Sequence, residues 1–318
     1  MSKTIINPQH PYKVDKVFLE FMNNIKNQSI ETTVATMVGY YHNLSMVNRA
    51  ILENYFDKYS FWGSLHDNTK DYTIMVNRAK SMHDHYDDFI WLFNKLEDNR
   101  SKLLLYGIVC NWYYFQGMEP MREAAFSQYF DLDIMKCDEN EVFVDVGAYK
   151  GETTLAFCSN YTVDNYKKIF CYEITPSAFR ELKNALSDYQ NVHCKMLGLS
   201  DVQETMFISE NTDETANSLL DIQPDNSTPV ITTTLDKDIE EPVTFIKMDI
   251  EGFEERALKG ASNHIKNDKP KLAIAVYHSN EDIWKLPRLI DSYNPDYKFH
   301  LRYHGGNLSP TEITLLAV

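Results

Sequence analysis

The first part of the chain alternates apolar and polar residues with the spacing of amphipathic helices. From Val14 to Ile25 apolar side chains recur every three or four positions, and the same spacing returns repeatedly before residue 116. The pattern predicts helices over 14–25, 34–44, 49–59, 72–83, 89–96 and 103–115. These stretches contain neither a glycine loop nor strand-like alternation, so we expect a mainly helical domain over residues 1–130.

After residue 140 the pattern changes to short apolar runs, which are typical of buried strands, separated by helical stretches. We expect strands over 142–146, 168–172, 192–199, 205–208, 230–235, 243–249, 272–277, 297–303 and 313–318. We also expect a helix that begins at Pro176 and Ser177, and helices over 254–265 and 282–293. Strands that alternate with helices indicate an α/β domain, here over residues 131–318.

The first of these strands leads into a glycine loop with the spacing D-x-G-x-x-x-G. Asp145 ends the strand, Gly147 and Gly151 lie in the loop, and a helical pattern follows. A strand, a glycine loop and a helix together bring a ligand against backbone N–H groups at a helix N-terminus. The alternative interpretation is a tight strand-to-helix turn that binds no ligand.

Two later strands also end in polar residues. Glu173 follows the second strand, about 20 residues beyond the glycine loop, where a carboxylate suits the two hydroxyl groups of a ribose. Ser200 and Asp201 follow the third expected strand, a position that suits contact with an adenine amino group. The three strand ends together predict a nucleoside site at one edge of the sheet.

Four sequence pieces now carry a family resemblance: D-V-G-A-x-x-G-E-T-T, Y-E-x-x-P, K-M-D-I-E-G-F-E and A-L-K-G-A. Together they resemble the FkbM-type methyltransferases over residues 140–318. The resemblance implies S-adenosylmethionine as the cofactor and a Rossmann-like, seven-stranded class I methyltransferase sheet, mostly parallel with one antiparallel strand. The cofactor-binding residues that it implies are Asp145, Gly147, Tyr149, Gly151, Thr153, Glu173, Ser200, Asp201 and Asp249.

Methyl transfer to an alcohol requires a general base, and two strand ends offer candidates. Asp249 and His278 are the catalytic candidates, although His278 could merely cap a strand and Asp249 could hold the acceptor hydroxyl or a metal. Glu251 is expected to pair with backbone near Gly252. Magnesium, held by Asp249, Glu251 and His278, is a further candidate that the spacing does not demand.

The composition argues against some classes of binding partner and indicates a cellular setting. A net charge of −15 argues against a nucleic-acid partner and against an anionic membrane surface. The five cysteines are odd in number and show no C-x-x-C spacing, which fits a reducing, cytoplasmic setting. We expect no signal peptide, and the sequence contains no apolar run of the roughly 18–20 residues that span a bilayer.

The resemblance favours O-methylation of a sugar or another alcohol. Two alternatives stay open: N-methylation of an amine or peptide, and a methyltransferase fold that binds without catalysis. The helical domain is expected to recognise a small-molecule or glycan acceptor, or to form a homo-oligomer. The polar stretch 210–228 is either a lid near the cofactor or a disordered loop.

Overall fold

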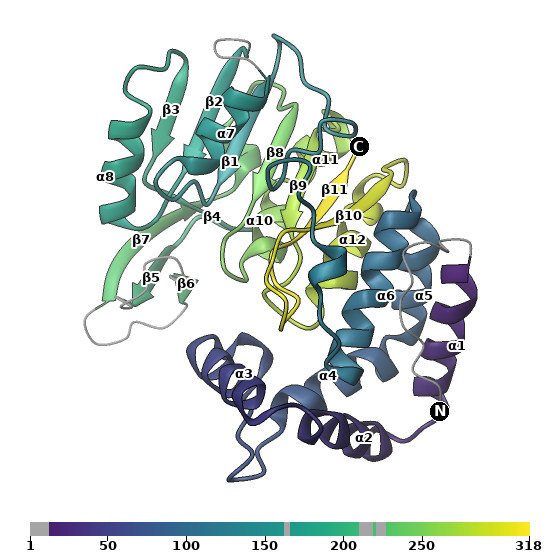
Figure 1. Ribbon diagram of the computed structural model, residues 1–318. Helices are drawn as coiled ribbons and strands as arrows, with labels where there is room; N and C mark the ends of the chain where they lie inside the picture. Colours follow the sequence, from purple (N-terminus) through teal and green to yellow (C-terminus); the bar gives the residue numbers. More distant parts are fainter. Residues whose placement is uncertain (1–12, 162–165, 210–218, 221–226) are drawn as a thin grey trace. The chain divides into compact units, whose positions relative to one another are not determined.

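The computed structural model describes residues 13–161, 166–209, 219–220 and 227–318 (Figure 1). The chain divides into two units. The first contains Met1–Ala124, Val276–Arg288 and Lys298–Thr314, and the second contains Ala125–Ala275, Leu289–Tyr297 and Leu315–Val318. The predicted division at residue 130 lies close to the end of the first segment, but the sequence did not indicate that two C-terminal segments group with the helical region.

The first unit is mainly helical, as predicted. Its long helices are α1 (Val14–Lys26), α2 (Ile30–His42), α3 (Met46–Lys58), α4 (Thr73–Asp84), α5 (Tyr86–Lys95) and α6 (Asn99–Tyr114), with 3-10 turns at Ser60–Trp62 and Glu119–Met121. The N-termini of α2, α3 and α6 are each capped by a side chain that accepts a hydrogen bond from a backbone N–H. The capping residues are Ser29, Ser45 and Asp98. Such caps satisfy N–H groups that have no partner within the helix.

The apolar stripes of these helices form the core of the first unit. Val14, Phe18, Phe21, Met22 and Ile25 are the buried positions of α1, which is the face that the spacing predicts. The Phe18 ring stacks on the ring of Phe93 from α5 at a centroid distance of 4.2 Å. The N-terminal helices are therefore held together by packing of these stripes.

The sheet contains seven strands in the order β10-β11-β9-β8-β1-β2-β3, which confirms the predicted α/β architecture. Its members are β1 (Val142–Val146), β2 (Lys168–Tyr172), β3 (Val192–Lys195), β8 (Phe245–Met248), β9 (Lys271–Ala275), β10 (Phe299–Tyr303) and β11 (Ile313–Ala317). Strand β1 pairs in parallel with both β2 and β8. Because β2 and β8 lie on opposite sides of β1, the strand order reverses there, and ligands bind at such reversals.

Strands β1, β2, β3, β8 and β9 belong to the second unit, which also contains helices and a smaller sheet. The helices are α7 (Glu152–Tyr161), α8 (Pro176–Ala185), α9 (Leu235–Asp238), α10 (Glu254–Gly260) and α11 (Ser262–Asn267), and α12 (Asp282–Tyr293) runs from the first unit into the second. The smaller sheet contains β4 (Gly198–Leu199), β5 (Thr205–Ser209), β6 (Leu219–Leu220) and β7 (Ser227–Thr233), in the order β4-β7-β5-β6. Most of the expected lid, 210–228, lies outside the described residues.

Two element predictions are wrong. The expected strand 192–199 is two strands, because the chain leaves the large sheet after Lys195 and Gly198 then pairs with Thr232 of β7. The expected helix 254–265 is broken between α10 and α11. A Cβ at Gly260 would lie 2.0 Å from the Ser200 carbonyl oxygen, so the helix meets the backbone of the neighbouring segment at that point.

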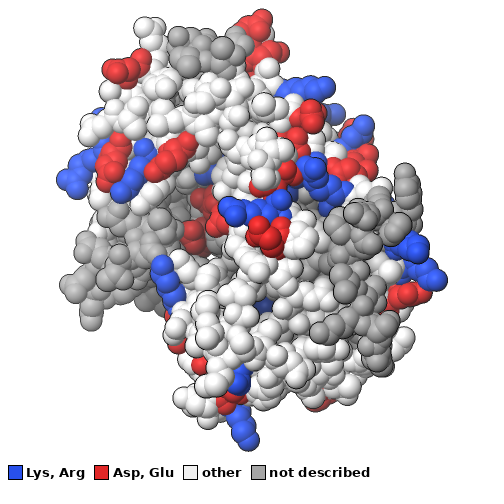
Figure 2. Space-filling view, in the orientation of Figure 1, with Lys and Arg blue, Asp and Glu red and all other residues white. Residues whose placement is uncertain are grey.

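The surface gives no sign of charge segregation on the side drawn in Figure 2, where basic and acidic side chains lie interspersed. The net charge of −15 is therefore not collected into one acidic patch on that face. Among the described residues, no helix has the length and the apolar character needed to cross a bilayer.

Candidate functional site

The loop after β1 is tightly fitted to its neighbours. Gly147 and Gly151 have φ values of +76° and +99°, and Tyr149 between them has +47°. A Cβ at Gly147 would lie 1.9 Å from the carbonyl oxygen of Asp249, so only glycine fits there. The N–H groups of Gly147 and Ala148 both donate to the Tyr172 carbonyl at 3.0 Å. The loop therefore rests on the carboxyl ends of β2 and β8.

Glu173 connects this loop to β2. The side chain is 7% exposed. Its Oε2 accepts the Tyr149 N–H at 2.9 Å, and its Oε1 accepts the Thr175 N–H at 2.7 Å. Burial raises the pKa of the carboxyl, although these N–H groups act in the opposite direction. The Thr175 side chain and the Ile174 N–H also hydrogen-bond the carboxylate and act to lower its pKa, so several protein donors hold Glu173 in place.

Asp145 is fully buried at the end of β1. The Lys247 Nζ lies 3.0 Å from its Oδ1, and the Thr154 hydroxyl donates to its Oδ2 at 2.7 Å. Lys247 also donates to the Gly147 carbonyl at 2.7 Å. The buried Asp145–Lys247 pair thus holds the glycine loop in position through the hydrogen bond to the Gly147 carbonyl. Thr153, the predicted contact residue, is only partly buried, and the adjacent Thr154 fills the buried position.

Asp249 follows β8 and is partly buried. The Tyr129 hydroxyl donates to its Oδ2 at 2.5 Å. Tyr129 has a φ of +72°, and the Lys247 Nζ lies 5.3 Å from the centroid of its ring. Sequence reasoning missed Tyr129, because a tyrosine in an irregular segment carries no signal that it will reach a residue 120 positions away.

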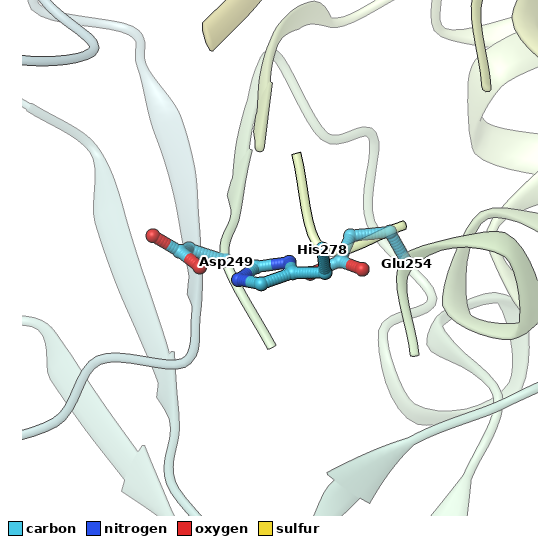
Figure 3. A group of neighbouring side chains, drawn as sticks. All are labelled: Asp249, Glu254 and His278. Atoms are coloured by element: carbon cyan, nitrogen blue, oxygen red, sulfur yellow. The ribbon is translucent and has the colours of Figure 1, made fainter. Parts of the chain in front are cut away.

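The turn after Asp249 is held by Glu254. Its two carboxylate oxygens accept the N–H groups of Ile250 and Gly252, at 2.8 and 3.1 Å. Glu251 has a left-handed backbone with a φ of +55°, and its predicted pairing with backbone near Gly252 stays a prediction. Asp249 and Glu254 of the second unit are drawn in Figure 3.

His278, also drawn in Figure 3, belongs to the first unit. It is 3% exposed. Within the first unit its ring centroid lies 4.3 Å from that of Tyr277 and 6.3 Å from that of Phe61. Its predicted role as a general base together with Asp249 remains a prediction.

Ser200 and Asp201 follow β4 of the smaller sheet. Ser200 is fully buried, and its hydroxyl lies 3.1 Å from Asp201 Oδ1. Asp201 pairs with Arg256 Nε at 2.7 Å, and Arg256 also pairs with Glu204. The predicted adenine contact therefore already takes part in a network that connects β4 with α10.

The second unit thus brings together the glycine loop, Glu173 and Asp249 at the carboxyl ends of β1, β2 and β8. A family model for the methyltransferase FkbM domain matches residues 145–303. A search of curated proteins found no match.

Several solved structures are similar to this chain. For methyltransferase FkbM from Methylobacillus flagellatus KT, the identity is 24% and the TM-score 0.63, covering 77% of this chain and 62% of that one. A putative methyltransferase from Streptococcus mutans in complex with SAH is 14% identical, with a TM-score of 0.38 over 59% of this chain and 93% of that one. Fibrillarin from Aeropyrum pernix, with natively bound S-adenosyl-L-methionine, is 12% identical, with a TM-score of 0.38 over 58% and 70%.

The likeness to the Methylobacillus flagellatus structure shows the predicted Rossmann-like class I fold. This chain spans 62% of the length of that structure.

Proposed function

Because the chain belongs to the FkbM methyltransferase family, we propose that it transfers a methyl group from S-adenosylmethionine to an acceptor molecule. The observation that carries the proposal is Glu173, a buried carboxylate at the end of β2 that is fixed beside the glycine loop by the N–H groups of Tyr149 and Thr175. This arrangement suits the two hydroxyl groups of a ribose.

The glycine loop supports the same cofactor. The absence of a side chain at Gly147 lets the loop pack directly against the Asp249 carbonyl, and the Asp145–Lys247 pair holds the loop through the Gly147 carbonyl. We assign Asp145 and Thr154 a positioning role rather than direct contact, because both side chains are buried and bonded to each other. When bound, the cofactor supplies an electrophilic methyl group.

For the acceptor we propose a sugar or another alcohol. Its hydroxyl group must lose a proton as the new bond to the methyl carbon forms, and Asp249 is the candidate to receive it or to orient the hydroxyl. Tyr129 fixes Asp249 through the hydrogen bond to Oδ2, which restricts the carboxylate to one orientation. His278 is the second candidate for this proton.

N-methylation of an amine or peptide is the main alternative, since a neutral amine can attack without a base. Unchanged turnover in both Asp249→Asn and His278→Ala would favour it. Cofactor binding without transfer to any acceptor would favour the non-catalytic alternative. We make no proposal for magnesium, because two of its predicted ligands, Asp249 and Glu251, belong to the second unit and the third, His278, belongs to the first.

The proposal is tested by calorimetry with S-adenosylmethionine and its demethylated product. Glu173→Ala should weaken binding of both by about 1–3 kcal/mol, because two hydroxyl groups lose their acceptor. Glu241→Gln is the matched control, because Glu241 pairs with Lys168 at the opposite end of β2. Absence of binding by the wild-type chain would refute the proposed cofactor.

The pH dependence of binding gives a second test. Only the ionised carboxylate can accept both hydroxyl protons, and burial raises the pKa of Glu173 above its usual 4.5. Affinity should therefore fall as the pH is lowered, and the fall should begin at a higher pH than for an ordinary glutamate. Glu173→Gln should bind weakly with a flat profile over that range. A wild-type profile as flat as that of the variant would remove Glu173 from the cofactor site.

A further inference from the structure

Among the residues that the structure describes, Arg78 of α4 is a buried charge without an ionic partner. The residue is 3% exposed and belongs to the helical first unit. Within the part of the chain that the structure describes, no carboxylate pairs with its guanidinium and no acceptor takes a hydrogen bond from it. Burial lowers the pKa of the group to about 9, so it is still charged at neutral pH. A buried charge of this kind is costly unless an anion compensates it.

Two aromatic rings of the described residues attract the positive charge of Arg78 but accept no hydrogen bond from its N–H groups. The guanidinium carbon lies 5.4 Å from the ring centroid of Phe56 in α3 and 5.5 Å from that of Trp112 in α6. A guanidinium has five N–H donors. Its Nε is fully enclosed without a partner, whereas Nη1 and Nη2 are not among the fully enclosed atoms. The tip of the side chain is therefore the part that a small ligand can reach.

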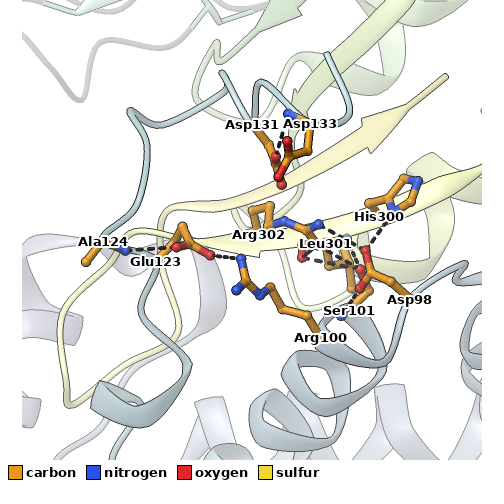
Figure 4. Close-up of polar contacts among 10 residues, drawn as sticks. All are labelled: Asp98, Arg100, Ser101, Glu123, Ala124, Asp131, Asp133, His300, Leu301 and Arg302. Carbon is orange, nitrogen blue, oxygen red and sulfur yellow. Dashed lines mark hydrogen bonds and ion pairs between the residues drawn. The ribbon is translucent and has the colours of Figure 1, made fainter. Parts of the chain in front are cut away.

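The same unit pairs its other deeply buried arginine. Arg302 has a side chain that is 7% exposed, and its Nη2 lies 3.0 Å from Asp98 Oδ2, while its Nη1 donates to the carbonyl of Leu301 (Figure 4). The unit thus supplies a carboxylate where a buried arginine serves the fold. Arg78 differs because aromatic rings take the place of that carboxylate.

Tyr55 of α3 adds a hydroxyl group next to this charge. Burial raises the pKa of Tyr55 to about 12, although the nearby charge of Arg78 acts to lower it. Its hydroxyl therefore keeps its proton at neutral pH and can donate to an anion. Arg78 and Tyr55 come from different helices of the same unit; the Thr311 side chain hydrogen-bonds Tyr55, and the charge of Glu312 acts to raise the pKa of Tyr55.

We propose that Arg78 anchors a binding site in the first unit for a small molecule that carries a carboxylate. A guanidinium and a carboxylate match in shape, because two parallel N–H groups can donate to the two oxygens. The single positive charge of Arg78 neutralises a carboxylate, which carries one negative charge. It does not fully neutralise a phosphate monoester, which carries up to two. The site is assigned to the helical unit and is independent of the proposed methyl transfer.

The test uses the full-length chain and follows the thermal midpoint of unfolding. Sodium benzoate should raise the midpoint in a concentration-dependent manner, because a ligand that binds the folded state stabilises it. Sodium chloride at equal ionic strength and benzyl alcohol, which lacks the carboxylate, should not. Inorganic phosphate should bind more weakly than benzoate. A wild-type chain that responds to benzoate no more than to chloride would overturn the proposal, and tighter phosphate binding would overturn the choice of carboxylate.

Substitutions of Arg78 distinguish a ligand-binding role of its side chain from a purely structural role. Arg78→Met should weaken benzoate binding at least about tenfold, and without ligand its midpoint should equal or exceed that of the wild type, because an uncompensated charge is removed. Arg302→Met is the matched control: it should lower the midpoint, because Asp98 loses its partner, and keep the benzoate response. A lowered midpoint in Arg78→Met together with an unchanged benzoate affinity would overturn the proposal.

A second variant covers the case in which Arg78→Met fails to fold. Arg78→Lys keeps the charge but not the paired N–H groups, so benzoate binding should be weaker than in the wild type. Equal benzoate affinity in Arg78→Lys and wild type would contradict recognition by the guanidinium. Binding of S-adenosylmethionine, measured in the same preparations, should be unchanged in both variants. A failure of the proposed cofactor therefore cannot be confused with a failure of the carboxylate site.

Discussion

The two units bury charge in different ways. In the second unit Asp145 and Lys247 are 0% and 2% exposed and lie 3.0 Å apart. In the first unit Arg78 is 3% exposed, and the described residues offer it two aromatic rings instead of a carboxylate. Burial of either charge costs desolvation free energy, but among the described residues only Lys247 has a carboxylate that compensates it. The difference suggests that the pair serves the architecture and that the lone charge serves a ligand.

The architectural role of the pair follows from its position. Asp145 of β1 and Lys247 of β8 are register partners in adjacent parallel strands. Lys247 also donates to the carbonyl of Gly147, so one ammonium group connects two central strands and the glycine loop. The pair therefore fixes the loop on which the proposed cofactor site depends.

The largest expected effect comes from breaking this pair. Lys247→Met should lower the free energy of unfolding by about 3–5 kcal/mol, because Asp145 would be left charged and buried without its partner. Urea unfolding followed by circular dichroism measures the change. Arg78→Met, the same type of substitution in the other unit, should cause no such loss. Equal destabilisation by the two substitutions would remove the contrast between the units.

A double variant separates the contribution of charge compensation to stability from the contribution of Lys247 side-chain packing. Asp145→Leu combined with Lys247→Met removes both charges, and it should recover most of the stability lost in Lys247→Met. It should nevertheless bind S-adenosylmethionine less tightly than the wild type, because the glycine loop loses its brace. If the double variant is as unstable as the single one, packing of the Lys247 side chain rather than charge compensation holds the strands.

The next largest expected effect is a loss of turnover, caused by substitutions in the second unit. Asp249→Asn should keep cofactor affinity within a few-fold and reduce turnover by roughly 10²–10⁴ if a base is lost. Tyr129→Phe keeps the carboxylate but removes the hydroxyl that holds it, so turnover should fall less than in Asp249→Asn. Transfer of labelled methyl groups to a panel of sugar nucleotides, glycans and alcohols measures both. Wild-type turnover in Asp249→Asn would exclude Asp249 as the base.

The residues that sequence reasoning located share a local signal. Gly147, Gly151 and Glu173 follow apolar runs directly, and the end of a buried strand can be read from a short window. Tyr129 and Lys247 carry no such signal. Lys247 lies inside an apolar strand, and its burial is compensated by Asp145 on the neighbouring strand and by the Gly147 carbonyl. Contacts between distant segments decided these roles.

Arg78 shows the same limit in a helix. The pattern correctly predicts a helix over 72–83, but the apolar spacing does not say that a charged residue will lie on its buried face. That outcome depends on Phe56 and Trp112, which come from two other helices. The expected strand 192–199 fails for a related reason, because its apolar run continues while the chain changes from one sheet to another.

The smallest effect concerns the paired arginine of the first unit and completes the contrast with Arg78. Asp98 caps α6 by accepting the Ser101 N–H, and it also bonds His300 and Arg302 of β10 (Figure 4). Burial alone would raise the pKa of the carboxyl, but these partners outweigh it and hold the pKa well below the usual range. Asp98→Asn should therefore cost about 1–2 kcal/mol at pH 7, measured by urea unfolding.

The sign of the pH dependence follows from the lowered pKa. Asp98 contributes its stability above the pKa of an unfolded aspartate, about 3.9, and loses it as the pH falls from there toward the lower folded value. The difference in unfolding free energy between wild type and Asp98→Asn should thus be constant from pH 7 to 5 and shrink below about pH 4. A difference that stays constant down to pH 3 would show that Asp98 acts through its shape as a cap rather than through its charge on Arg302. The difference between wild type and Arg78→Met should not shrink in this way, because no carboxylate among the described residues compensates Arg78.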